Sequence, residues 1–339
     1  IYSNSNNYII AVHQQYQTSG YASIQFAITA EFPDMDTGYI EDGFDYCVEP
    51  GANLMSYPCD SAVALLDAIP SDALSQFEGI IGAGTAASNL DGVWVGSITN
   101  LSPGSGYWIK LDASASMQLI DAIPSDPAIV YNMHYGANLI SFPIPGSVGI
   151  GDGIPDDVEG FFTGIIGEGV AASPNPTLGW VGSLSAFEGG KGYWAKVDQS
   201  VSFSFIVDES SSRLYSKSYY GDFDYAQSTQ QAFYFIEDVV FADGESIESG
   251  DVILAYNENV LVGAREWFGA FTDIPAMGAD GSSETIGYCD GYTNPVMKLI
   301  KKSTGAEYIL DSEIPSWSNN ELFQIGVVYA RESVLPTEH

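Results

Sequence analysis

The fold is decided by a stretch that the chain contains twice, Gly182-Ser-Leu-Ser-Ala-Phe-Glu-Gly-Gly-Lys-Gly-Tyr-Trp194 and Gly96-Ser-Ile-Thr-Asn-Leu-Ser-Pro-Gly-Ser-Gly-Tyr-Trp108. Further out, Gly51-Ala-Asn-Leu-Met-Ser-Tyr-Pro58 corresponds to Gly136-Ala-Asn-Leu-Ile-Ser-Phe-Pro143. The offset is 85 residues from Gly51 to Gly136 and 86 from Trp94 to Trp180, so one residue is inserted between these points. Because repeats decide the architecture, we predict a tandem duplication of a module of roughly 75 residues.

The duplication divides the chain of 339 residues into segments. Residues 1–45 are expected to form N-terminal strands that serve as an assembly segment, since Ile24, Phe26 and Ile28 alternate with less apolar residues. We predict module one at residues 46–130, module two at 131–209, a serine-rich linker at 210–218 and a third domain at 219–339.

Each module is expected to be a small α+β unit. In module one, the segment from Pro70 to Asp72 has the composition of a helix start, and Leu74, Phe77 and Ile81 follow at helical spacing. In module two, Pro155-Asp-Asp157 begins the same pattern. We therefore predict one helix of about ten residues per module, packed against a few antiparallel strands.

The third domain has the periodicity of strands. The candidates are Ala232–Ile236, a hairpin of Val252–Tyr256 and Val260–Ala264, a second hairpin of Val296–Lys301 and Glu307–Leu310, and a last strand at Phe323–Tyr329. Short strands separated by turn signals favour an antiparallel β-sandwich. The fold class predicted for the whole chain is mainly β with short helices.

Composition narrows the classes of partner. There are 10 Lys and Arg against 44 Asp and Glu, a net charge of −34, and no Lys or Arg precedes Lys110. Such a field repels phosphate backbones and anionic membrane surfaces, so we expect neither nucleic-acid binding nor membrane insertion. No apolar run is long enough to span a bilayer, and no signal-peptide pattern is present. The acidity is explained either by a solvated surface in salty, divalent-rich water or by specific cation binding.

Two groups of residues carry a resemblance. One is the repeated pattern Gly-Ala-Asn-Leu-Ile-Ser-Phe-Pro, Ile-Ile-Gly, Trp-Val-Gly-Ser-Leu and Gly-Lys-Gly-Tyr-Trp; the other is Gln231-Ala-Phe-Tyr-Phe-Ile236 with Val262-Gly-Ala-Arg-Glu-Trp267. The repeated pattern resembles modules of structural proteins of marine phages, cyanophages among them, and of marine bacterial surface proteins. The other group resembles a β domain often joined to these modules. The resemblance covers about residues 46–330, implies a virion or extracellular structural role, and carries over no catalytic residue.

Acidic loops supply the candidate metal ligands. Asp152 and Asp156 lie in Asp152-Gly-Ile-Pro-Asp-Asp-Val-Glu159, and Asp280 lies in Gly278-Ala-Asp-Gly281. Carboxylates in glycine-containing loops are the hard oxygen ligands that calcium prefers, although neither segment matches an EF-hand. Helix capping explains Asp156 and Glu159 without a metal, and an Asp-Gly turn explains Asp280. Calcium is therefore the one cofactor that the sequence suggests.

Aromatic and sulfur residues supply two further candidates. Trp108 and Trp194 form a ligand platform if they are exposed, since flat rings stack on sugars; their recurrence at matched positions favours burial inside each module instead. Cys47 and Cys59 flank the strand expected at Asn53–Tyr57, and their counterparts in module two are Asn132 and Ile144. This joint replacement makes a disulfide one alternative, and two free thiols the other.

The sequence contains no nucleophile elbow, phosphate loop, zinc motif or dinucleotide fingerprint, so we expect no enzymatic activity. The leading hypothesis is a non-enzymatic virion or extracellular structural protein, a fibre, decoration or surface subunit that forms homo-oligomers or larger assemblies. One alternative is a glycan-binding adhesin of a marine bacterium. The less favoured alternative is a secreted glycoside hydrolase with paired acids such as Asp156 and Glu159.

Overall fold

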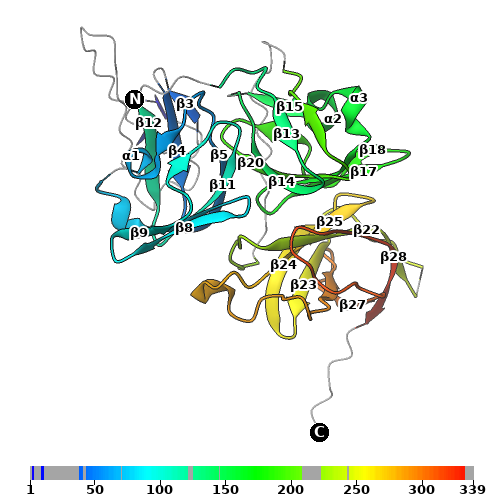
Figure 1. The fold of residues 1–339 in the computed structure, drawn as a ribbon. Helices are drawn as coiled ribbons and strands as arrows, with labels where there is room; N and C mark the ends of the chain where they lie inside the picture. Colours follow the sequence, from blue (N-terminus) through cyan, green and yellow to red (C-terminus); the bar gives the residue numbers. More distant parts are fainter. Residues whose placement is uncertain are drawn as a thin grey trace.

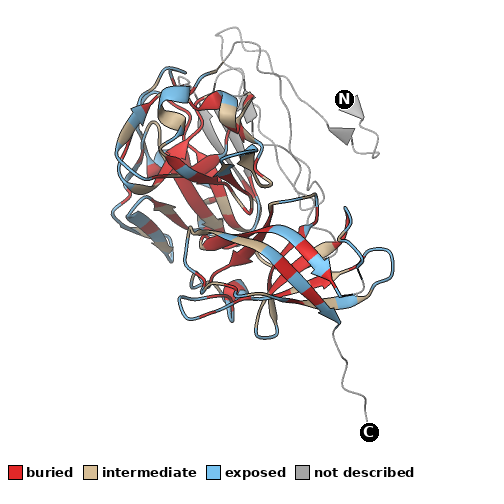
Figure 2. Ribbon diagram, turned by 90° about the vertical axis from the view of Figure 1, so that its right-hand side faces the viewer, coloured by how far each residue is buried: buried red, intermediate tan, exposed pale blue. Residues whose placement is uncertain are grey.

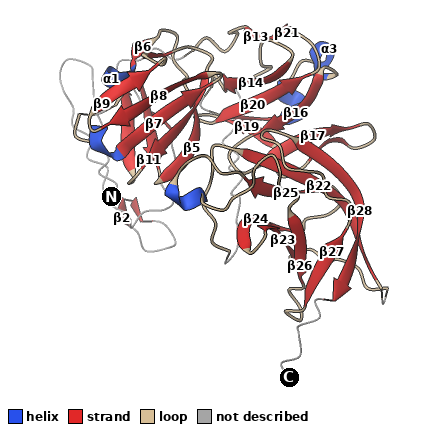
Figure 3. Cartoon of the chain, turned by 60° about the horizontal axis from the view of Figure 1, so that its bottom comes forward, coloured by secondary structure: helices blue, strands red, loops and turns tan. Residues whose placement is uncertain are grey.

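The structure is a computed structural model that describes residues 2–3, 9–10, 38–40, 43–69, 71–120, 125–144, 146–207, 223–242 and 244–332. These residues form three β-rich bodies, two modules that lie side by side and a third domain beneath module two (Figure 1). Strands make up the body of each unit, and the helices are short pieces at the periphery (Figure 3). The fold is mainly β with short helices, as predicted.

Module one is built on a five-stranded antiparallel sheet. Its strands, in spatial order, are β5 (Gly51–Ser56), β11 (Gly106–Leu111), β7 (Phe77–Gly82), β8 (Thr85–Leu90) and β9 (Val93–Gly96). The other elements are β3 (Gly38–Ile40), β4 (Gly43–Val48) and β12 (Ala115–Ile120) in one small sheet, β6 (Val63–Ala64) and β10 (Asn100–Leu101) in another, and the short helices α1 (Leu65–Ala68) and η1 (Leu74–Gln76). The core includes Tyr57, Phe77, Ile80 and Ile109.

The main sheet of module two has the same strand order as that of module one, whereas the small sheet β12-β4-β3 corresponds to the two strands β13 (Tyr131–Met133) and β21 (Val201–Phe203). The order in the main sheet is β14 (Gly136–Ser141), β20 (Gly192–Val197), β16 (Phe162–Ile166), β17 (Ala171–Asn175) and β18 (Gly179–Val181). The other smaller elements are β15 (Ser147–Gly149) with β19 (Ala186–Glu188), α2 (Ile150–Gly153) and α3 (Asp156–Glu159). Trp108 pairs with Leu54 and Ile81, and Trp194 pairs with Leu139 and Ile166. The two main sheets share one strand order, as the predicted duplication requires.

The predicted ten-residue helices are wrong. In module one, a single 3-10 turn at Leu74–Gln76 leads directly into β7, so Phe77 and Ile81 belong to a strand. In module two, α3 ends at Glu159 and β16 follows. The β-branched pair Ile-Ile packs well on a pleated surface, and β11 and β20 supply the pairing that local spacing does not reveal. No side chain caps α3, whose N-cap is Pro155, so the capping role of Asp156 is also wrong.

The two modules pack against each other through nearly equivalent contacts. Ser56 N donates to Gly190 O at 3.0 Å, and its counterpart Ser141 N donates to Gly104 O at 3.1 Å. Isolated bridges join Met55 to Lys191 and, reciprocally, Ser105 to Ile140. In an isologous contact both partners use the same surface, so every contact between two residues is matched by a reciprocal contact between their counterparts. The modules are therefore related by an internal pseudo-twofold axis.

The third domain is one curled sheet. Its strand order is β24 (Val260–Glu266), β23 (Val252–Asn257), β26 (Val296–Ile300), β27 (Glu307–Asp311), β28 (Leu322–Glu332), β22 (Gln231–Phe241) and β25 (Thr272–Met277). The two edges come together, because a Cβ at Gly263 of β24 would lie 1.8 Å from Pro275 O of β25. The sheet is thus nearly closed around a core of buried residues, drawn in red in Figure 2. The expected strands are present, but β22 and β28 pair in parallel, unlike the antiparallel sandwich predicted.

The boundary expected between residues 45 and 46 is displaced. Strand β4 crosses it and pairs with β12, so module one begins before residue 46. The β1 (Tyr2–Ser3) and β2 (Ile9–Ile10) strands pair with each other, whereas the strand expected at Ile24–Phe32 and the linker at 210–218 lie outside the described residues. In the part of the chain that the structure describes, no helix has the length and apolar character needed to cross a membrane.

Candidate functional site at the domain junction

The third domain is seated on the outer face of the main sheet of module two. Alternate residues of a strand point to opposite faces, so Tyr193, Ala195 and Val197 of β20 enter the module core, while Trp194 and Lys196 face outward. On that outer face an apolar cluster joins the two bodies, with Ile166, Ala171, Val181 and Trp194 from module two and Phe233, Phe235, Phe271 and Leu322 from the third domain. We call this surface of module two the docking face.

A buried ion pair fixes the third domain to the docking face. Arg265 and Asp273 are 7% and 0% exposed in their side chains, and Arg265 Nη2 lies 3.4 Å from Asp273 Oδ2. Asp273 also accepts hydrogen bonds from the backbone N–H and the hydroxyl of Ser183, both at 2.7 Å. Arg265 Nη2 donates to Gly169 O at 2.7 Å. Burial raises the pKa of Asp273, and the Arg265 charge and the Ser183 donors oppose that rise.

The side chain of Gln231 forms hydrogen bonds with the turn between β16 and β17. Gln231 Nε2 donates to Gly167 O at 2.7 Å, and Gln231 Oε1 accepts from Gly169 N at 3.0 Å. Gly169 has φ 64°, a left-handed conformation that glycine adopts without strain. The side-chain amide therefore satisfies backbone groups that the turn presents to the third domain.

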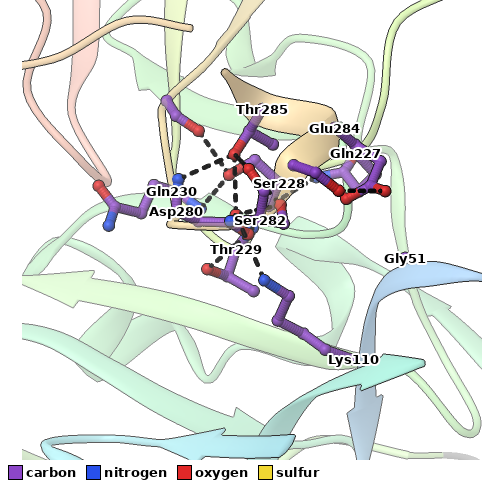
Figure 4. A network of polar contacts seen from close by, with 12 residues as sticks. Gly51, Lys110, Gln227, Ser228, Thr229, Gln230, Asp280, Ser282, Glu284 and Thr285 are labelled. Carbon is purple, nitrogen blue, oxygen red and sulfur yellow. Dashed lines mark hydrogen bonds and ion pairs between the residues drawn. The ribbon is translucent and has the colours of Figure 1, made fainter. Parts of the chain in front are cut away.

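A second contact joins the third domain to module one through Asp280 (Figure 4). Asp280 Oδ1 accepts from the Ser282 hydroxyl at 2.6 Å and lies 3.3 Å from Lys110 Nζ, and Oδ2 accepts from Thr229 N at 3.1 Å. Burial alone would raise the pKa of Asp280, but these hydrogen bonds and the Lys110 charge hold it well below its usual range. Both oxygens of the Asp280 carboxylate are therefore bound by donors from the protein itself.

A cavity of about 330 Å³ lies beside this contact, and Glu78, Lys110, Asp112 and Glu284 are among its lining residues. A hydrogen bond between the carboxyls of Glu78 and Asp112 raises the pKa of Glu78 above its ordinary value, with burial contributing less. Carboxyls that hydrogen-bond each other are closer than the about 5 Å that separates the acids of a retaining glycosidase. The pair is therefore suited to sharing a proton rather than to glycoside hydrolysis.

The predicted calcium ligands do not form one site. Asp152 lies in α2 and Asp156 begins α3, both in module two, whereas Asp280 lies at the junction with module one. Glu159, which was paired with Asp156 as a catalytic acid, accepts a hydrogen bond from Trp180 Nε1 at 2.6 Å. Among the residues described, no group of three or more His, Cys, Asp or Glu side chains is placed to hold a metal ion.

Trp108 and Trp194 do not form an exposed platform. Trp108 is 1% exposed and packs with Leu54, Leu139 and Trp194 between the two modules. Trp194 is partly buried and contacts the third domain as well. Trp108 presents no face to solvent as a sugar-binding surface would require, and neither ring belongs to the core of its own module. Trp94 and Trp180 do pack, partly buried, against their own module cores.

The disulfide alternative is wrong. Cys59 is a free thiol, 2% exposed, so it does not bridge to Cys47, whose side chain lies outside the described residues. Burial raises the pKa of Cys59 to about 11, with its contact to the Tyr57 side chain acting in the opposite direction.

Sequence reasoning missed the residues that join the domains, namely Lys110, Lys196, Gln231, Arg265 and Asp273. A signal was present for the lysines, because both modules contain Tyr-Trp-x-Lys at the same place in the repeat. Another was present for Arg265, a lone cation between the apolar run from Val260 and Trp267. Comparison with models of protein families, with curated proteins and with solved structures finds no match for this chain.

Proposed function

We propose that this chain is a non-enzymatic structural protein of a virion or an extracellular surface, used as a fibre, decoration or surface subunit. Its partners are other protein subunits, copies of itself among them, rather than nucleic acid. The observation that carries the proposal is the pseudo-twofold contact between the two modules. This module associates with a second module through an isologous contact, which is the kind of interface that homo-oligomers use.

The polar groups at the domain junction support the same proposal. Arg265, Asp273 and Asp280 are each engaged by protein donors or acceptors. These side chains hold the bodies together. A scaffold in which charged residues fix domain positions fits a subunit that bears load or presents a surface.

Charge makes the proposed assembly dependent on salt. A net charge of −34 keeps copies apart at low ionic strength. In seawater-like salt the Debye length falls to about 4 Å, so apolar and hydrogen-bonded contacts decide association. We therefore expect larger species in high salt than in low salt.

Sedimentation velocity of the full chain at low and high salt tests this, beside a variant that lacks residues 1–36. The deletion ends before β3, because β3 and β4 complete a sheet with β12 in module one. If the N-terminal segment mediates assembly, the full chain forms oligomers in high salt and the shortened chain does not. If both remain monomeric at every salt concentration, and electron microscopy shows no filaments or particles, the proposal fails and a monomeric glycan-binding protein becomes the better account.

A further inference from the structure

Module one carries a second copy of the docking face. Its residues are Gly84, Ala86, Ser88, Val95, Ser97 and Lys110, the counterparts of Gly169, Ala171, Ser173, Val181, Ser183 and Lys196. Every one of these residues is identical to its counterpart. The turn that Gln231 contacts in module two has an equivalent in module one with the same backbone conformation, since Gly169 has φ 64° and Gly84 has φ 67°. The chemistry that holds the third domain on module two is therefore present twice.

The two copies differ in what covers them. On module two, Ala171 and Ser173 are 0% and 6% exposed beneath the third domain. On module one, Ala86 and Ser88 are exposed, and Val95 is 45% exposed. In module two, the backbone N–H and the hydroxyl of Ser183 bind Asp273. In module one, the same two groups of Ser97 donate to Ala86 O within the module, at 2.7 Å and 3.3 Å.

The third domain lies across the pseudo-twofold axis. It holds Lys196 through Asn320 O at 2.7 Å and holds the equivalent Lys110 through Asp280. These two contacts are linked inside the domain, since Thr229 N donates to Asp280 and Asn320 N donates to Gln231 O. A second third domain on module one would need the same space between the lysines. The two docking faces can therefore be occupied only in alternation.

We propose that the chain's own third domain has two seats, the docking face of module two that it occupies in the structure and the duplicate face of module one. Moving between them is a half-turn about the pseudo-twofold axis. Gln231 would then donate to Gly82 O and accept from Gly84 N. Arg265 would donate to Gly84 O, and Asp273 would accept from Ser97. Asp280 and Asn320 would exchange lysines, so each lysine keeps an acceptor in the third domain.

The length of the connection between the two bodies limits this exchange. Residues 208–222 connect module two to the third domain, and at about 3.5 Å per residue they allow a reach of roughly 50 Å. Minor conformers that lie a few kcal/mol above the major one are populated at roughly 0.1–10%. The inference does not depend on the proposed structural role, because it concerns the position of a domain within one chain.

Distances between paired spin labels test the two seats in the full chain. Labels are attached at Tyr292 of the third domain and at either Leu178 of module two or Leu90 of module one, which are 95%, 60% and 59% exposed. Each site is changed to cysteine in a Cys47→Ser background, in which the other native thiols, Cys59 and Cys289, are buried. Wild type gives the distances of the module-two seat.

A matched pair of substitutions then blocks one seat at a time. Ala171→Arg places a long charged side chain under Phe233 and Phe235, and Ala86→Arg is the same change on the duplicate face. With Ala171→Arg, we expect the Tyr292–Leu178 and Tyr292–Leu90 distances to approximately exchange in most molecules, while Ala86→Arg alone retains the wild-type distances. The double variant frees the domain and gives broad distributions.

Two results overturn the proposal. One is an Ala171→Arg distribution as broad as that of the double variant, which means that the duplicate face binds nothing. The other is an Ala171→Arg distribution equal to that of wild type, which means that this face is not what holds the domain. Sedimentation of the same samples shows whether the third domain on the duplicate face comes from the same chain or from a second copy. If the exchanged distances are seen only in dimers, the domain comes from a second copy and the proposal is also overturned.

Discussion

At the scale of single residues, the two modules solve the same burial problem differently. In module two, Trp180 Nε1 donates to Glu159 at 2.6 Å. In module one, the equivalent Trp94 Nε1 is buried without a hydrogen-bond partner among the described residues, because Leu74 stands at the position of Glu159. A buried donor that keeps its partner avoids a desolvation cost, so Glu159 has a structural role in module two.

Replacing Glu159 with the residue that module one uses should therefore destabilise module two. For Glu159→Leu we expect the free energy of unfolding to fall by about 1–3 kcal/mol, because Trp180 loses a charged acceptor. Urea denaturation followed by circular dichroism measures the change. Asp156→Ala removes an exposed acid of the same helix and should change stability by less than about 0.5 kcal/mol. Equal effects of the two variants would contradict the role given to Glu159.

The thiols should be unreactive in the native protein. Burial raises the pKa of Cys59 to about 11 and of Cys289 to about 12, and the thiolate is the form that reacts. We expect an alkylating reagent at pH 8 to modify both only after unfolding, as measured by mass spectrometry of peptides from native and urea-treated samples. Modification of Cys59 at the rate of a free thiol, or recovery of a peptide in which it is linked to Cys47, would contradict the structure.

At the scale of elements, the ends of β7 and β11 form the pH-sensitive part of the junction. Glu78 in β7 hydrogen-bonds Asp112 just after β11, and both line the cavity beside Lys110 and Glu284. The raised pKa of Glu78 means that its protonated form is favoured in the folded state. Its contribution to stability is therefore full below the ordinary pKa of 4.5 and is lost as the pH rises through the raised value.

Comparing wild type with Glu78→Gln tests this sign. Gln keeps a hydrogen bond to Asp112 at every pH, so we expect the stability of the variant relative to wild type to increase as the pH rises above 4.5. Asp280 acts oppositely, since its pKa is lowered and its contribution, present above 3.8, is lost only in stronger acid. Thermal denaturation between pH 4 and pH 8 measures the effect at Glu78, its extension to more acidic pH measures the effect at Asp280, and Glu332→Gln is an exposed control. A pH profile that is parallel for wild type and Glu78→Gln would remove Glu78 from this role.

At the scale of the whole molecule, two Arg–Asp pairs allow burial to be separated from charge. Arg265–Asp273 is buried between the third domain and module two, whereas Arg331–Asp311 is 66% and 57% exposed at 3.0 Å. Removing one partner of a buried pair leaves an uncompensated charge, which costs about 3–5 kcal/mol, while an exposed pair contributes about 0–1 kcal/mol. The first pair should decide whether the bodies stay together.

For Arg265→Met we expect release of the third domain at lower urea concentration than unfolding of the modules, measured by proteolysis between the domains and by circular dichroism. Arg331→Met should unfold as wild type does. A double change, Arg265→Met with Asp273→Leu, should recover part of the loss, because no buried charge is left unpaired. If Arg265→Met behaves as Arg331→Met does, the buried pair does not hold the domain.

The sequence by itself determined the duplication, the β-rich class and most strands of the third domain, because repeat spacing and two-residue alternation are local patterns. It misassigned Phe77 and Ile81, whose spacing fits a helix equally well, because the deciding pairing with β11 comes from residues about thirty positions away. Only the tertiary structure decided that Trp108 and Trp194 lie between bodies. Both faces of a strand can carry apolar residues. Which part of the protein covers the face that points away from the module core depends on contacts between residues far apart in the sequence.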